Sequence, residues 1–247
     1  MRRYAQPGLS SLCRVWRASD VRRSQASVFR PGGKVMDAST SPFEEYSERM
    51  AASDLRRYRD KGPRPWTRTL IEALKTEGVE GATLLDIGGG IGVIQHELLG
   101  AGAAHATSVE ASAACLAAAR EESERRGYGG RVTYRHGDFV ELAESVPSAD
   151  IVTLDRVVNV YPHVDELVGL SAEHAQRLYG LVLPRDTRVV RLSIFAINLV
   201  QRLRRQRVRA AVVPIDDIER VVRDKGLTPR FSQDVGPVWQ VAVYGRP

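Results

Sequence analysis

A short apolar run, a carboxylate and three alternating glycines lie together in the first half of this 247-residue chain. Thr83 to Ile87 have the length and aliphatic content of a buried parallel strand. Asp86 lies within this run, and three glycines follow it at every second position: Gly88, Gly90 and Gly92. Glycine permits backbone angles that are closed to other residues and lets the main chain approach a ligand without intervening Cβ atoms. We therefore predict a strand followed by a turn that binds a nucleotide-like ligand.

The residues after this turn support a ligand site. Apolar residues recur at helical spacing in the range 91–99, which predicts a helix whose N-terminus opens on the turn. Free amides and the positive end of the helix dipole favour a carboxylate or phosphate at such a position. A tight strand-to-helix turn without any ligand is the alternative.

The spacing of the glycines separates two classes of cofactor. A dinucleotide fingerprint needs Gly-x-Gly-x-x-Gly, but Val93 stands where the third glycine would follow Gly88 and Gly90. The stretch instead resembles the Asp-x-Gly-x-Gly-x-Gly signature of class I S-adenosylmethionine-dependent methyltransferases, matched by Asp86, Gly88, Gly90 and Gly92. The resemblance implies S-adenosylmethionine as the cofactor and these four residues as part of its site. The missing third glycine disfavours a nucleotide-dependent oxidoreductase.

Two further acids follow the next two predicted strands. Glu110 ends the second strand, where a carboxylate can accept hydrogen bonds from both hydroxyls of a ribose, and Ala111 would then lie beside the adenine. Asp138 and Phe139 follow the third strand. They resemble the acidic loop of the family, which implies a carboxylate that accepts the adenine amino group and a backbone amide that binds a ring nitrogen.

The segment that leaves the fourth predicted strand, 155–163, should face both the sulfonium and the acceptor. We therefore predict Asp155 and Arg156 as cofactor residues. His163 is the predicted catalytic base, because a neutral imidazole beyond the strand end could take a proton from the acceptor. Tyr161 could meet the sulfonium with its ring face or bond to the acceptor. In the alternative, the acceptor reacts by alignment alone and His163 simply begins the next helix.

This segment also bears on the substrate. Enzymes of this fold that methylate amino groups of nucleobases usually carry Asn/Asp/Ser-Pro-Pro-aromatic here, and the order Asn159-Val160-Tyr161-Pro162 does not match it. Residues 1–34 hold eight Lys or Arg against one acid, while the remainder carries 28 basic residues against 29 acids. Because the body of the chain is not basic, we expect no nucleic-acid partner.

The basic N-terminal segment is predicted to be a leader separate from the enzyme. We expect residues 1–38 to be disordered and to act as a transit peptide, a basic arm or an extension before a true start at Met36. Residues 39–247 are the predicted methyltransferase domain. Within it, 39–79 hold N-terminal helices that would act as a lid, with Tyr46 and Tyr58 as candidate substrate residues. Ordinary amphipathic packing of these tyrosines is the alternative.

The order of predicted elements indicates an α/β three-layer sandwich. Strands are expected at 83–87, 105–110, 131–136, 150–154 and 181–183, with a closing hairpin at 228–233 and 238–244. Helices are expected at 43–59, 66–74, 91–99, 113–126, 165–179, 188–207 and 216–225. The family resemblance implies a Rossmann-like, seven-stranded, mainly parallel sheet with an antiparallel last strand. The apolar stripe of the helical insertion, 187–210, is expected to pack as core or cap, with contact to a membrane surface as the alternative.

These observations predict transfer of a methyl group from S-adenosylmethionine to a small organic acceptor, most simply at oxygen. The stretch from Leu154 to Asp217 is similar to magnesium-protoporphyrin methyltransferases, so a carboxyl methyltransferase of that type is one alternative. A non-catalytic protein that binds the cofactor is another. No His, Asp or Glu cluster has metal-ligand spacing, and no stretch is long enough for a transmembrane helix. Cys13 and Cys115 lack partner spacing, which fits a cytoplasmic protein; a homodimer is compatible with the sequence.

Overall fold

The computed structural model describes residues 48–203 and 210–247. All of them belong to the second of two compact units, Thr40–Pro247. The predicted leader, residues 1–38, lies outside the described residues, as does Tyr46.

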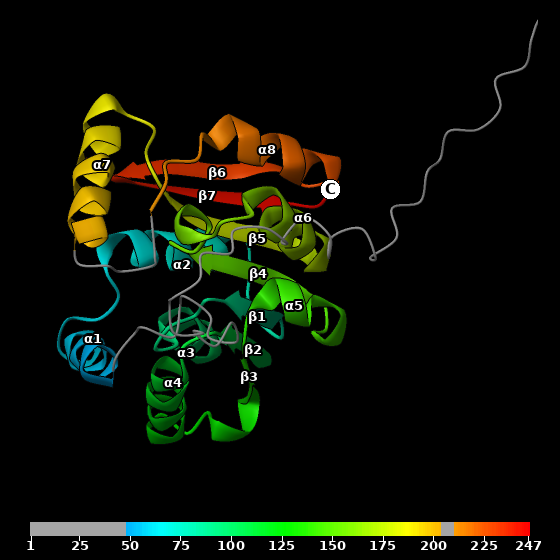
Figure 1. Ribbon diagram of the computed structural model, residues 1–247. Coiled ribbons are helices and arrows are strands. Elements are labelled where there is room, and N and C mark those ends of the chain that lie inside the picture. The colour runs from blue at the N-terminus through cyan, green and yellow to red at the C-terminus, as the bar shows by residue number, and fades with distance from the viewer. Residues whose placement is uncertain (1–47, 204–209) are drawn as a thin grey trace, which may run out of the picture. The chain divides into compact units, whose positions relative to one another are not determined.

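One seven-stranded sheet forms the centre of this unit, with the strand order β3-β2-β1-β4-β5-β7-β6 (Figure 1). Neighbouring strands from β3 to β5 are parallel, whereas β7 runs antiparallel to both β5 and β6. This arrangement confirms the predicted fold. The strands are β1 (Thr83–Ile87), β2 (His105–Glu110), β3 (Val132–His136), β4 (Ala149–Asp155), β5 (Ala175–Pro184), β6 (Thr228–Val235) and β7 (Trp239–Gly245).

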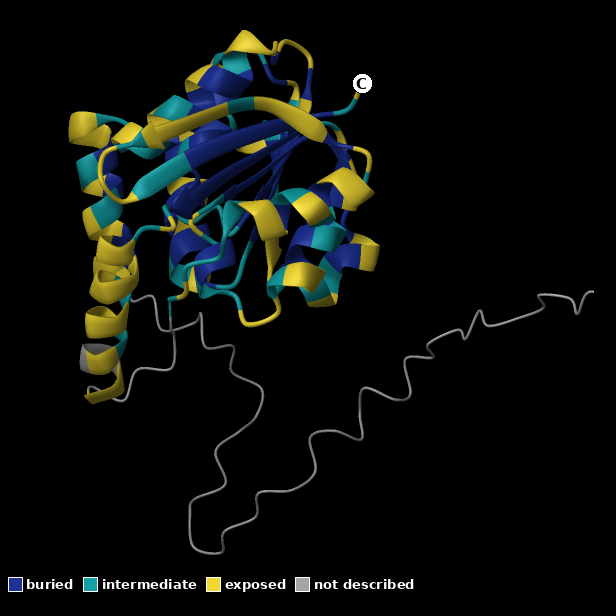
Figure 2. Ribbon diagram, turned by 90° about the horizontal axis from the view of Figure 1, so that it is seen from above, coloured by how far each residue is buried: buried dark blue, intermediate teal, exposed yellow. Residues whose placement is uncertain are grey.

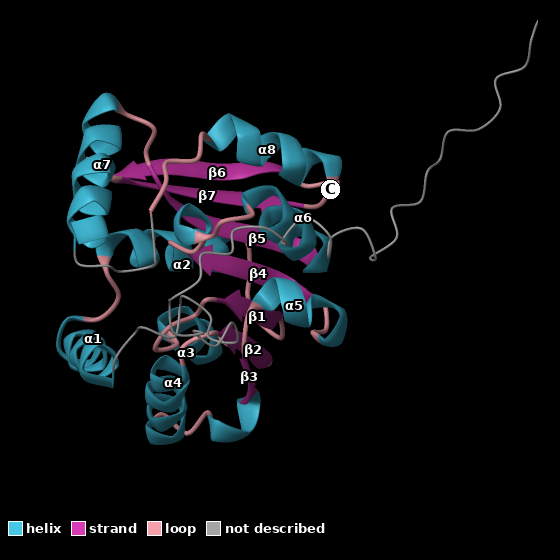
Figure 3. Cartoon of the chain, in the orientation of Figure 1, coloured by secondary structure: helices cyan, strands magenta, loops and turns pink. Residues whose placement is uncertain are grey.

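Helices cover both faces of the sheet (Figure 3). One face packs against α2 and α3, and α4 joins that layer because its Ser123 hydroxyl bonds to His96 of α3. The other face packs against α5, α6 and α8. The helices are α1 (Glu48–Lys61), α2 (Pro65–Thr76), α3 (Val93–Gly100), α4 (Ala113–Arg125), α5 (Phe139–Leu142), α6 (Val164–His174), α7 (Arg188–Leu203) and α8 (Ile215–Asp224).

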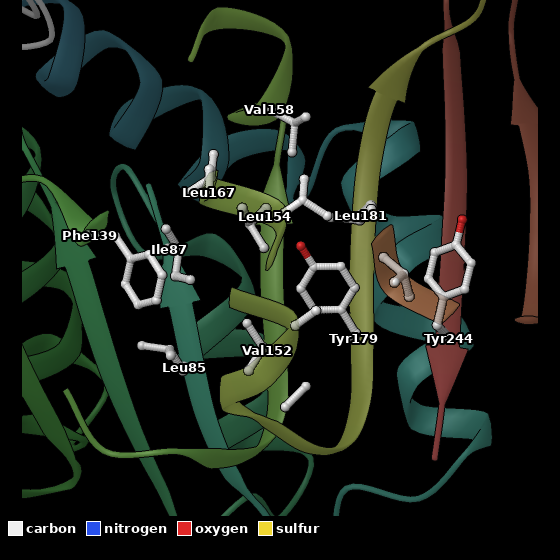
Figure 4. Close-up of a cluster of buried hydrophobic side chains, with 14 of the residues drawn as sticks. Leu85, Ile87, Phe139, Val152, Leu154, Val158, Leu167, Tyr179, Leu181 and Tyr244 are labelled. Atoms are coloured by element: carbon white, nitrogen blue, oxygen red, sulfur yellow. The ribbon is translucent and has the colours of Figure 1, made fainter. Parts of the chain in front are cut away.

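The core on the α6 side holds the central strands rigidly. Leu85, Val152 and Leu154 are fully buried there (Figure 4). Tyr179 is also fully buried, and its hydroxyl lies 2.7 Å from the Ser171 hydroxyl of α6. A buried phenol needs such a partner, because an unpaired buried polar group is costly. The strands that carry the predicted acids are therefore held in place by a close-packed core.

The boundary between α6 and β5 differs from the prediction. A helix was expected over 165–179 and a strand over 181–183, but α6 ends at His174 and β5 begins at Ala175. The strand pairs with β4 on one side and β7 on the other, and Leu178 lies opposite Gly245. Pairing with a strand far along the chain overrides the local helical pattern.

The expectation for the helical insertion is also wrong in part. The segment forms a helix, α7, but most of its large apolar side chains are exposed instead of packed as core or cap. Residues 204–209, at the end of the predicted helix, lie outside the described residues.

Candidate active site

A cavity of about 410 Å³ lies at the edge of the sheet where β1 to β4 end. The chain order reverses between β1 and β4, which is the position where open α/β sheets bind ligands. Asp86, Glu110, Asp138 and Asp155 come from four successive strand ends and all line the cavity. The fold therefore brings these acids together, as predicted. Helix α1 and the start of α2 form the remaining wall.

The glycine turn forms the floor of the cavity. Gly88 has φ +63° and Gly90 has φ +56°, both in the left-handed region, which favours glycine. A Cβ on Gly88 would lie 2.5 Å from a methyl group of Val157, whereas a Cβ on Gly90 would meet nothing within 4 Å. Gly88 is thus needed for packing, and Gly90 leaves bare backbone beside the cavity. Gly92 caps α3 and does not line the cavity.

Glu110 holds the glycine turn through hydrogen bonds. Its Oε2 atom accepts from the Gly90 amide at 2.9 Å, and its Oε1 atom accepts from the Ser112 amide at 2.8 Å. Burial raises the pKa of Glu110, while these backbone amides act in the opposite direction. Each carboxylate oxygen can accept a second hydrogen bond. The predicted ribose contact therefore remains possible in this geometry, with Ala111 beside it in the cavity wall.

Asp86 is a buried acid with spare hydrogen-bonding capacity. Its Oδ1 atom accepts from the Thr153 hydroxyl at 2.7 Å, and its Oδ2 atom has no hydrogen-bond partner among the described residues. Burial raises the pKa of Asp86 to about 7; the Thr153 bond opposes this shift, and the charges of Asp155 and Glu110 add to it. A cationic ligand group beside Oδ2 would stabilise the charged carboxylate.

Asp138 and Tyr161 form a pair that the sequence did not reveal. The Tyr161 hydroxyl donates to Asp138, at 2.9 Å from Oδ1 and 3.0 Å from Oδ2. Asp138 also accepts from the Val140 amide and so caps α5, next to Phe139. Burial and the neighbouring Asp138 charge raise the pKa of Tyr161 above its usual value. Tyr161 is therefore a neutral donor near pH 7 that orients the predicted adenine carboxylate.

Asp155 and Arg156 leave β4 in an unusual backbone conformation. Arg156 has φ 62°, a value that is uncommon outside glycine. Its Nε atom donates to Asp155 at 3.1 Å, and its guanidinium lies 5.6 Å from the ring centroid of Trp66 and 5.9 Å from that of Trp239. Thr67 donates to the other Asp155 oxygen at 2.5 Å. These contacts hold both predicted residues at the cavity.

Two arginines of the cavity wall were missed by the sequence analysis. Arg57 of α1 donates to the Gly62 carbonyl at 3.1 Å, and Arg64 pairs with Asp54 at 3.2 Å. Burial and the positive charges of Arg64 and Arg156 lower the pKa of Arg57, with Asp54 opposing. The three guanidinium groups therefore lie close enough to influence one another. The helical spacing of Asp54, Arg57 and Tyr58 places them on one face of α1, a signal that could have identified Arg57.

The structure does not bring every predicted residue to the cavity. His163 is exposed at the start of α6 and does not line the cavity, as in the alternative in which it begins the helix. Tyr58 lines the cavity, but its hydroxyl donates to Glu97 at 2.7 Å and its ring lies beneath the Arg126 guanidinium. The role of Tyr58 toward a substrate stays a prediction.

Residues 48–203 and 210–247 contain no group of three or more His, Cys, Asp or Glu side chains placed to hold a metal ion. Within the same ranges, no helix combines the length and apolar character needed to cross a bilayer.

Fold and cavity together define an α/β protein with an acid-lined cavity at the strand ends, where open α/β sheets bind ligands. Residues 84–178 match the family described as "Methyltransferase domain". The chain carries a class I S-adenosylmethionine-dependent methyltransferase domain, and its cofactor is S-adenosylmethionine. No curated protein matches the chain in sequence.

Solved structures share this fold at low sequence identity. An O-methyltransferase family protein from Burkholderia thailandensis has a TM-score of 0.63 and 18% identity, over 79% of this chain and 58% of that chain. Magnesium protoporphyrin IX methyltransferase from Synechocystis PCC 6803, with S-adenosylhomocysteine bound, has a TM-score of 0.62 and 18% identity, over 83% of this chain and 98% of that chain. An O-methyltransferase family 2 protein from Planctomyces limnophilus DSM 3776, in complex with apigenin, has a TM-score of 0.59 and 16% identity, over 87% of this chain and 63% of that chain.

Proposed function

We propose that this enzyme methylates an oxygen atom of a small organic acid. The observation that carries the proposal is a set of three arginines, Arg57, Arg64 and Arg156, that line the cavity together; we call them the arginine wall. Guanidinium groups bind carboxylates and other oxyanions through paired hydrogen bonds. An acceptor that carries such a group would be attracted to this wall and oriented by it.

The residues on the other side fit the cofactor. The unpaired Oδ2 atom of buried Asp86 suits the cationic amino group of the methionine moiety, and the bare backbone at Gly90 leaves room for close approach. We assign Glu110 to the ribose, and Asp138, with Phe139 beside it, to the adenine. When bound, the cofactor supplies an activated methyl group on a positively charged sulfur.

The chemistry left to the protein is alignment and exclusion of water. An acceptor oxygen must lie in line behind the methyl group, and correct positioning alone can supply a large part of the rate enhancement. A carboxylate is already ionised at neutral pH, so its methylation needs no general base. Within the described part of the chain no histidine lines the cavity, and its acids are either assigned to the cofactor above or paired with arginines. A carboxylate acceptor therefore fits the observed lining better than an alcohol, which would require proton removal.

The size of the cavity bears on the porphyrin alternative. A volume of about 410 Å³ lies toward the lower end of ligand sites, which span roughly 300 to 1,000 Å³. The same space must hold the cofactor and the acceptor. This favours a small acid over a tetrapyrrole, although the fold is shared with a magnesium protoporphyrin IX methyltransferase.

The test is an acceptor screen with methyl-labelled cofactor. Small carboxylic acids, phenols and amines are offered in parallel, and products are identified by mass spectrometry. Alkaline release of labelled methanol marks a methyl ester, because ethers and methylamines resist this treatment. We expect methyl esters, and an Arg57→Gln variant should raise the KM for the acceptor while its affinity for S-adenosylhomocysteine stays the same.

Two results would contradict the proposal. Exclusive methylation of amines would overturn the assignment of an oxygen acceptor. Turnover of neutral acceptors, with a KM that Arg57→Gln leaves unchanged, would remove the arginine wall from recognition. Cofactor binding without turnover of any acceptor in the screen would favour the non-catalytic alternative.

A further inference from the structure

Helix α7 directs most of its large apolar side chains into solvent. Among the described residues, six of the eight exposed large apolar side chains belong to this one helix. Leu203, Val189, Leu192 and Phe195 are 77, 73, 69 and 66% exposed, and most of the helix is coloured as exposed in Figure 2. Single exposed apolar residues are ordinary, whereas a contiguous exposed patch marks an interaction surface.

Five of these six side chains lie on one side of the helix, whereas Ile197, seven residues after the buried Val190, lies on the other. Val189, Leu192, Leu199 and Leu203 recur at intervals of three, seven and four, which places them along one stripe. Phe195 lies three residues after Leu192 and belongs to the same stripe. We call these five residues the α7 stripe.

The opposite side of the helix is anchored to the domain. Val190 is buried. The Asn198 side chain forms two hydrogen bonds with Ala210, donating to its carbonyl at 2.7 Å and accepting from its amide at 3.0 Å. The helix is therefore fixed on one side while the stripe faces outward, so the exposure follows from how the helix is held.

The charges on α7 are all positive. The helix contains no acid, and Arg188, Arg191 and Arg202 are all exposed. Asp186, which precedes the helix, pairs with Arg191. The sequence from 204 to 209 adds four arginines and no acid. A basic rim beside an apolar stripe is the composition of helices that lie on anionic membranes.

We propose that α7 docks the enzyme on an anionic lipid surface, with the α7 stripe inserted among the acyl chains and the three arginines at the phosphate level. Apolar burial and attraction to anionic headgroups would act together. At 16 residues, the helix is shorter than the roughly 20 residues needed to cross the hydrocarbon layer, so it would lie in the plane of the surface. A second copy docked helix to helix would instead bring arginines together without an acid on either helix.

The position of α7 gives such docking a consequence for the active site. The helix follows β5, which runs parallel to β4 and therefore ends at the same edge of the sheet (Figure 1). The cavity lies at this edge, because residues at the end of β4 line it. The segment that follows α7 is bonded to the wall of the cavity. The Ala211 amide donates to the Asn159 carbonyl at 2.6 Å, and the next residue, Val160, lines the cavity. A docked α7 would hold this edge of the enzyme near the lipid.

Vesicle flotation of the full chain tests the proposal. Phosphatidylcholine vesicles are compared with equimolar phosphatidylcholine–phosphatidylglycerol vesicles at low and high salt. We expect binding to the anionic vesicles that weakens with salt. The variant Leu192→Ser/Phe195→Ser/Leu199→Ser should weaken it about tenfold or more, since it removes the inserted side chains. Val238→Ser, an exposed apolar residue outside the helix, is the matched control and should bind as the parent chain does.

A second pair of variants separates the charge contribution. Arg188→Gln/Arg202→Gln should weaken binding to anionic vesicles about tenfold. The control Arg220→Gln/Arg223→Gln removes two exposed arginines from α8 and should leave binding unchanged. All variants keep the basic residues 1–34, so these contribute equally throughout. Unaltered affinity for S-adenosylhomocysteine shows that each variant is folded.

Hydrogen exchange identifies the surface that is covered. Anionic vesicles should slow amide exchange in peptides from 188–203. Unchanged flotation of the triple serine variant would overturn the proposal. So would concentration-dependent protection of α7 without lipid, lost together with dimer formation in that variant, because the stripe would then bind a second copy of this chain.

Discussion

Replacement of Glu110 by alanine probes the proposed contact between this carboxylate and the ribose of the cofactor. In the proposed complex, this carboxylate accepts one hydrogen bond from each ribose hydroxyl. Hydrogen bonds to a charged group contribute about 1.5 kcal/mol or more each, so the loss of both should weaken binding of S-adenosylhomocysteine by about 3 kcal/mol. This corresponds to roughly a 150-fold increase in Kd, which isothermal titration calorimetry can measure.

The structure shows why the single variant is not sufficient. Glu110 also accepts from the Gly90 and Ser112 amides, so alanine releases the glycine turn as well as the ribose. A 2′-deoxy analogue of S-adenosylhomocysteine separates the two effects. With the parent enzyme, the missing hydroxyl should weaken binding by about 1.5 kcal/mol. With Glu110→Ala, the hydroxyl has no partner to lose, and its removal should make little difference.

The comparison is a double-mutant cycle between protein and ligand, and its interaction energy isolates the contact. If the two losses simply add, the ribose does not bind Glu110, and the residue serves only to hold the turn. Glu124→Ala is the matched control, because Glu124 is an exposed glutamate of α4 outside the cavity. Its Kd should equal that of the parent enzyme.

Four further predictions concern the other groups. The pKa of Asp86 is raised to about 7, so the carboxyl group of the folded protein without ligand stays protonated between about pH 4 and 7, whereas that of the unfolded chain loses its proton. The free energy of unfolding should therefore fall as pH rises through that window, and urea titrations of Asp86→Asn should show a smaller fall. Tyr161→Phe should weaken S-adenosylhomocysteine binding by about 1 kcal/mol with little change in kcat, and a 100-fold loss of kcat at unchanged Kd would restore its catalytic role. His163→Ala should retain most of kcat across the pH profile, whereas a loss of about 10² would indicate a base. Removal of residues 1–38 should leave Tm and cofactor affinity nearly unchanged, and a large drop in Tm would show that they pack on the domain.

The acids that line the cavity at the strand ends could be predicted from the sequence, because local patterns indicate the strands that carry them. Asp86 lies near the end of one predicted strand, Glu110 ends the next, and Asp138 follows the third. In a parallel sheet such strand ends meet at one edge, so three local patterns imply one site. The order of the glycines then selected the cofactor class. None of these steps required knowledge of distant contacts.

Other features depend on contacts that no local pattern records. The segment from Ala175 to Gly180 follows the helical stripe of α6 without a break and becomes a strand because β4 and β7 enclose it. Arg57 reaches the cavity only because α1 packs on α4. The stripe of α7 revealed an amphipathic helix, but periodicity does not show whether protein or solvent faces the apolar side.

Arg156 was predicted as a cofactor residue, and we propose that it binds the acceptor. A backbone conformation with φ 62° costs about 1 to 3 kcal/mol in a residue other than glycine, and the conformation persists only where the surrounding structure enforces it. Here the Arg156 amide donates to the Val182 carbonyl at 3.0 Å, and the guanidinium is held by Asp155 and by the rings of Trp66 and Trp239. The last ring comes from β7, near the end of the chain, so complete folding of the sheet is required to place this charge. In the proposed complex, strand ends thus position the cofactor, whereas long-range packing positions Arg156, which we assign to the acceptor.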